Sequence, residues 1–80
     1  MTSRTADIIE YIAKAVVDDA EAVRVQETRD GDRVVVRLDV GDEDWGKVIG
    51  KGGRIASAMR SMLKVAAVKD DVRANLEIGD

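Results

Sequence analysis

The chain is organised around residues 46–69, which read GKVIGKGGRIASAMRSMLKVAAVK. This window holds six of the 13 basic residues and none of the 16 acidic ones. The remainder therefore carries seven basic and 16 acidic residues, a net charge of −9, in a chain whose overall charge is only −3. A positive segment within an acidic protein predicts an anionic binding partner.

The composition limits the possible functions. Eighty residues predict a single domain spanning residues 1–80. Cysteine and histidine are absent from the sequence, which removes thiolate metal ligands and the commonest general base. We therefore expect no catalytic residue, no metal and no cofactor, and thus not an enzyme. No apolar run approaches the roughly 18 residues that span a bilayer, which predicts a cytoplasmic protein without a membrane partner.

Apolar spacing predicts an α+β domain with the order α-β-β-α-α-β. The expected elements, in chain order, are a helix over 5–18, a strand starting at 23, a strand over 33–40, a short helix over 42–49, a helix over 54–69 and a strand over 72–78. Valines and a leucine on one face of 33–40, with charged residues on the other, predict a three-stranded sheet with helices packed on one face.

The predicted core consists of the inward-facing apolar residues of these elements. They are Ile8, Ile12, Val16, Val23, Val25, Val34, Val36, Leu38, Val48, Ile49, Ile55, Met59, Leu63, Leu76 and Ile78. Residues 62–68 are apolar except for Lys64, which is more than one buried helix face requires. Part of this segment is therefore expected to contact another protein.

Three glycines in four residues separate the two adjacent helices, at Gly50, Gly52 and Gly53. The segment is not a phosphate-binding P-loop, because its spacing is one residue short and no hydroxyl follows the lysine. Without Cβ atoms, however, this turn lets a sugar-phosphate backbone approach the main chain closely. It also opens a helix, whose free N–H groups attract phosphate. A flexible connector is the alternative interpretation.

Basic and polar side chains continue from this turn along one face of the 54–69 helix. Lys51 and Arg54 flank the turn, and Ser57, Arg60 and Lys64 follow at helical spacing. Trp45 lies just before the turn. We expect it to pack the short helix against the core, and stacking on a nucleic-acid base is the alternative.

The segment from Val48 to Gly53 contains Ile-Gly-x-x-Gly and resembles the core motif of KH domains. Along its whole length the chain resembles the KhpA family of small bacterial single-KH RNA-binding proteins. Because the additional helix and strand precede the β-α-α-β core, the resemblance implies a type II KH fold. It also implies that the glycine turn clamps the backbone of single-stranded RNA.

The expected RNA-binding residues are Gly50, Lys51, Gly52, Gly53, Arg54, Lys47, Ile49, Ser57, Arg60 and Lys64. The resemblance further implies a post-transcriptional regulator or RNA chaperone that pairs with itself, as a homodimer, or with a larger KhpB (Jag)-like protein, as a heterodimer. An adaptor that docks such a partner, with RNA binding secondary, is the alternative function. Its apolar interface would not weaken as salt rises, whereas RNA binding would.

Overall fold

The computed structural model describes residues 4–79, and it confirms the predicted order of elements. These elements are α1 (Arg4–Val16), η1 (Ala20–Ala22), β1 (Arg24–Asp30), β2 (Arg33–Asp39), η2 (Asp42–Asp44), α2 (Trp45–Ile49), η3 (Lys51–Gly53), α3 (Arg54–Lys69) and β3 (Arg73–Ile78), where η marks a 3₁₀ turn. Within this range, no helix is long and apolar enough to cross a membrane.

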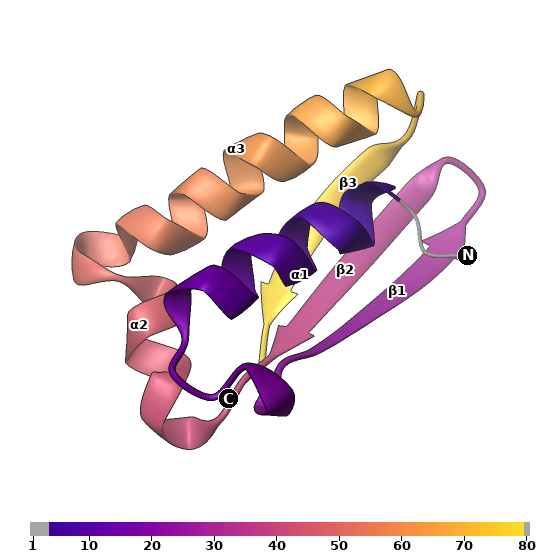
Figure 1. The fold of residues 1–80 in the computed structure, drawn as a ribbon. Helices are drawn as coiled ribbons and strands as arrows, with labels where there is room; N and C mark the ends of the chain where they lie inside the picture. Colours follow the sequence, from indigo (N-terminus) through magenta and orange to yellow (C-terminus); the bar gives the residue numbers. More distant parts are fainter. Residues whose placement is uncertain (1–3, 80) are drawn as a thin grey trace.

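The three strands form one mixed sheet in the order β1-β2-β3. The central strand β2 is antiparallel to β1 and parallel to β3, so that Val36 lies opposite Glu27 on one side and Leu76 on the other. A parallel pair needs a long crossover, and α2 and α3 supply it. Both long helices lie on the same face of the sheet (Figure 1), which confirms the one-sided packing.

Alternation along β2 explains this arrangement. Val34, Val36 and Leu38 are buried under the helices, whereas Arg33 and Arg37 are exposed on the other face. Side chains in a strand point alternately to opposite faces, so this pattern commits one face of the sheet to the core.

The inward face of α1 differs from the prediction. Its buried residues are Ile9 and Ala13, followed by Val17 just past the helix, whereas Ile8 and Ile12 are only half-buried. The two stripes lie about 100° apart on the helix, so apolar spacing alone does not choose between them. A small residue such as Ala13 at the centre of the stripe lets the helix backbone approach the sheet closely.

Other predicted core positions lie at the margin. Val25, Ile55 and Ile78 are partly buried against the core, and Ile49 is half-buried outside it. On α3 the buried positions include two small residues absent from the prediction, Ala56 and Ala67. Alanines at these places bring α3 close to its neighbours.

A buried carboxylate holds the start of α2 against the end of α1. Asp44 is only 4% exposed, and its two oxygens accept hydrogen bonds from the backbone N–H of Asp18 at 3.3 Å and of Asp19 at 3.0 Å. The ammonium of Lys47 lies 3.5 Å from the same carboxylate. The hydrogen bond from Asp19 is the main cause that lowers the pKa of Asp44 below its ordinary value. This contact positions the helix that leads into the glycine turn.

Two neighbouring isoleucines of α1, Ile8 and Ile9, provide a direct test of the inward face. Ile9→Ala should lower the free energy of unfolding by roughly 2–5 kcal/mol, because it leaves a cavity in a closed core. Ile8→Ala, at the half-buried neighbouring position, should cost only about 1 kcal/mol. Urea denaturation followed by circular dichroism measures both. Equal losses would show that the inward face is assigned wrongly.

The role of Asp44 predicts a pH dependence of stability. Because folding lowers the pKa of Asp44, its contribution is present above the unfolded value near 3.8 and is lost as the pH falls through the folded value. Asp44→Asn should therefore be less stable than the wild type at pH 7 and should lose less stability on acidification. Urea denaturation between pH 7 and pH 3 tests this, with exposed Glu43→Gln as the control. An Asp44→Asn profile parallel to that of the wild type would contradict it.

Candidate nucleic-acid interface

The turn between α2 and α3 is built from glycines with positive φ. Gly50 has φ +75° and ψ 172°, a region that is essentially restricted to glycine. A Cβ at this position would lie 2.5 Å from Cγ1 and 3.0 Å from the backbone nitrogen of Ile55. Gly50 is therefore required by the packing of the turn against the first residues of α3.

Gly52 and Gly53 differ from Gly50, because the space beside them is open. Their φ values are +66° and +76°, in the left-handed region, yet a Cβ at either position would meet no atom within 4 Å. A ligand can consequently approach the main chain here without meeting a side chain. The open surface predicted for the turn is thus present at these two residues.

Backbone N–H groups are concentrated at the same place. The first hydrogen bond within the turn is donated by the N–H of Gly53 to the carbonyl oxygen of Gly50, at 3.2 Å. The N–H groups of Lys51 and Gly52 come before this hydrogen bond in the chain and are not used by it. Gly53 is also the N-cap of α3, a helix of 16 residues. The positive end of this helix dipole therefore faces the turn.

Exposed cations surround the turn and follow α3. Lys51 and Arg54 are exposed at the turn itself, and Ser57, Arg60 and Lys64 are exposed along α3. Spacing of three and four residues places the last three on one face of the helix. The structure therefore brings five predicted site residues into one line that begins at the glycines.

A shallow groove lies beside the second half of this line. It has a volume of about 90 Å³, and its walls are Arg60, Leu63 and Lys64 from α3 with Ala74, Asn75 and Leu76 from β3. In the described sheet β3 pairs with β2 alone, so its other edge presents unpaired backbone groups toward α3. Asn75 was not predicted as a site residue, since a polar residue at an outward strand position gives no distinct signal.

Lys47 lies apart from the other predicted cations. It forms an ion pair with Asp18 and lies 3.5 Å from the carboxylate of Asp44. The hydrogen bond to Asp18 is the main cause that raises the pKa of Lys47. Because Lys47 and Ile49 are two residues apart, they point to nearly opposite sides of α2. The structure thus gives Lys47 a local structural role, and a role in nucleic-acid binding remains a prediction.

Acidic residues border the interface on the side of Lys47. A hollow there is lined by Lys47 and Gly41 together with Asp18, Asp19, Asp42, Glu43 and Asp44. In the described part of the chain, no group of histidine, cysteine or carboxylate side chains is arranged to hold a metal. The negative charge of this surface repels phosphate.

The remaining predicted residues lie on the outer side of α2. Ile49 is half-buried, and Trp45 is 40% exposed and outside the apolar core. More than half of the Trp45 surface is covered, so the expectation that it packs the short helix against the core remains a prediction. Trp45 precedes the turn closely in the chain, and the alternative role, contact with a ligand, is also a prediction.

Comparisons with known proteins identify relatives that match most of this chain. The family described as "KhpA/KhpB, KH domain" matches residues 6–78. A relative from Caldanaerobacter subterraneus subsp. tengcongensis named "RNA-binding protein KhpA" is 46% identical over 72 residues, which are 90% of this chain and 96% of the relative. The protein of the same name from Treponema pallidum is 41% identical over 80 residues, the full length of both chains.

Two solved structures of Era resemble the fold at low sequence identity. A point variant of Era from Aquifex aeolicus, bound to GDP and AlF4−, matches with a TM-score of 0.61 and 13% identity over 92% of this chain. Era in complex with MgGDPNP and nucleotides 1506–1542 of 16S ribosomal RNA matches with a TM-score of 0.52 and 16% identity over 92% of this chain. The matches span only 29% and 28% of the Era chains.

These likenesses show the fold, a type II KH domain, and the matches in sequence show the family. This chain therefore belongs to the KhpA/KhpB family of KH-domain proteins.

Proposed function

We propose that this protein binds single-stranded RNA by holding the phosphate backbone at the glycine turn. The observation that carries the proposal is the open main chain at Gly52 and Gly53, placed at the positive end of α3 and flanked by Lys51 and Arg54. Phosphate oxygens require close approach, free N–H groups and positive charge, and this turn offers all three. The names of the relatives, "RNA-binding protein KhpA", support RNA as the ligand.

The bases would lie in the groove between α3 and β3. Arg60 and Lys64 on α3 continue the positive line beside a strand edge with unpaired N–H and C=O groups. Such an edge can hydrogen-bond the exposed edges of unpaired bases. A groove of about 90 Å³ favours a single strand over a duplex. Within the groove, Asn75 is the one residue with a side-chain amide, so base selection is expected to be permissive.

Permissive binding fits a post-transcriptional regulator or RNA chaperone, which must act on many sequences.

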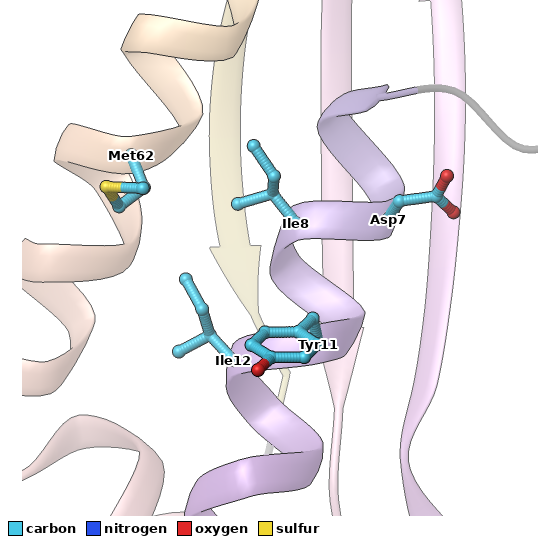
Figure 2. A pocket seen from close by; sticks show the side chains of 5 residues that line it. All are labelled: Asp7, Ile8, Tyr11, Ile12 and Met62. Carbon is cyan, nitrogen blue, oxygen red and sulfur yellow. The ribbon is translucent and has the colours of Figure 1, made fainter.

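A separate surface carries the proposal of pairing. Figure 2 shows Ile8 and Ile12 pointing from α1 toward the side of α3 that carries Met62, while Asp7 points the other way. The five residues labelled in Figure 2 line a hollow with a volume of about 620 Å³. Of these residues, Tyr11 is 78% exposed and Met62 is 48% exposed.

A second copy of the chain is the occupant that best matches this surface. The outer face of α1 carries Asp7 and Glu10 in its first half and Lys14 in its second half. If two copies place α1 antiparallel across a two-fold axis near Tyr11, the acids of one copy meet Lys14 of the other. Each Tyr11 can then enter the hollow of the partner. A larger KhpB-like protein that displaces one copy is the heterodimer alternative, and it would also serve the adaptor function.

The RNA-binding proposal predicts that the turn can be inactivated without loss of the fold. The double variant Lys51→Asp with Gly52→Asp places two negative charges where phosphate must lie. An aspartate at a left-handed position costs about 1–2 kcal/mol, so the variant should remain folded. Fluorescence anisotropy with a labelled single-stranded RNA should show a large loss of affinity. For the wild type, log affinity should fall with log salt at a slope of roughly −1.5 to −3 for two to four phosphate contacts.

The hairpin turn provides a matched control. Gly31 has φ +64° with no atom within 4 Å of a built Cβ, as at Gly52, and Lys69 is exposed like Lys51. Gly31→Asp with Lys69→Asp therefore makes the same changes in charge and backbone strain away from the turn. This control should bind RNA nearly as well as the wild type. If both double variants bind equally well while folded, the glycine turn is only a connector and the adaptor function is favoured.

The pairing surface is tested at Val65, which is 55% exposed one turn after Met62. Val65→Glu should shift the protein toward monomer in sedimentation velocity without unfolding it, because it buries a charge in the proposed interface. Val68 is less suitable, since it follows Lys64 by one turn on the RNA-binding face. Thr28→Glu, exposed on β1, is the control. A wild type that sediments as a monomer at high concentration would contradict the homodimer.

A further inference from the structure

Trp45 is the single tryptophan of the chain, which has one tyrosine and no phenylalanine. Tyr11 lies on α1, so Trp45 is the one aromatic residue next to the glycine turn. It is 40% exposed, so part of the indole is accessible to a ligand. An accessible indole beside a proposed phosphate site offers a ring face on which a nucleotide base can stack.

The short helix α2 places Trp45 on the helix face that leads into the turn. Trp45 and Ile49 are four residues apart, so they share one face of α2, and Gly50 follows Ile49 directly. The distance along the helix axis from position 45 to position 49 is about 6 Å. Lys47 points to the opposite side, where Asp18 and Asp44 engage it. The face of Trp45 therefore continues the surface of the glycine turn.

The charges around Trp45 select which part of a nucleotide can lie on it. Asp42 and Glu43, which precede it in the chain, are exposed and negative. They repel a phosphate, whereas the neutral ring face of a base can stack on an indole without meeting that repulsion. Phosphates should thus stay at the turn while a base lies on Trp45.

We infer that Trp45 is a stacking platform for the base adjoining the phosphate held at the glycine turn. This inference rests on the RNA binding proposed above and adds a base subsite on α2, separate from the groove beside β3. Because stacking strength sets the preferences of such sites, a purine should be favoured there. Stacking also requires an unpaired base, which excludes a duplex at this position.

The test uses the tryptophan as its own probe. Titration of the wild type with a single-stranded oligoadenylate should quench the fluorescence of Trp45, and an oligouridylate should quench it less. In parallel, anisotropy of a labelled oligoadenylate gives the overall affinity. Trp45→Leu should bind about 5- to 150-fold more weakly, as expected for loss of one stacked base. Trp45→Phe should recover much of the affinity.

Thr28→Leu is the control, because Thr28 is exposed on β1, away from both the glycine turn and the proposed pairing surface. It should leave RNA affinity unchanged. If the wild type binds labelled RNA but its tryptophan fluorescence stays constant, the stacking inference is overturned while the proposed function stands. An unchanged affinity of Trp45→Leu would overturn it in the same way. If the wild type binds no RNA, the proposed function fails as well. Should Trp45→Leu not fold, the quenching of the wild type decides.

Discussion

The contact between Gly50 and Ile55 is the constraint on which the interface depends. A Cβ at Gly50 would lie 2.5 Å from the side chain of Ile55, so the chain can turn this sharply only with glycine there. The turn ends α2 and starts α3 within four residues. It thereby places Gly52 and Gly53 at the surface, on the positive end of a 16-residue helix. Close packing at Gly50 thus leaves the main chain of Gly52 and Gly53 accessible.

Opposite charges on the two sides of α2 define the extent of the interface. Lys47 is drawn to Asp18 and Asp44, and it anchors the short helix on its acidic side. The cations that remain exposed begin at Lys51 and follow α3, beside the free edge of β3. A polyanion is attracted by one side and repelled by the other, so it can be oriented before contact is made. An overall charge of −3 conceals this separation.

The sequence predicted those features that depend on periodicity and on backbone chemistry. The alternation of apolar and charged residues over 33–40 predicted a sheet covered on one face, and the glycine spacing predicted the turn. The inward face of α1 was not predictable, because Ile8 and Ile9 head two apolar stripes and only packing against the sheet selects between them. The pairing of Lys47 joins residues 29 apart in sequence, which local patterns do not reveal. The exposure of Trp45 likewise depends on how α2 is seated, and Asp44 helps to set this through two backbone hydrogen bonds.

An NMR titration with amide resolution tests the central claim, that RNA is held at the glycine turn and extends along α3. Short single-stranded RNA would be added to the isotopically labelled protein while each backbone amide signal is followed. We expect the largest shifts at residues 50–54, continuing along α3 through Arg60 and Lys64 to the adjoining edge of β3. RNA binding that leaves the amides of the turn unmoved, with its largest shifts around Tyr11 and Met62, would contradict it.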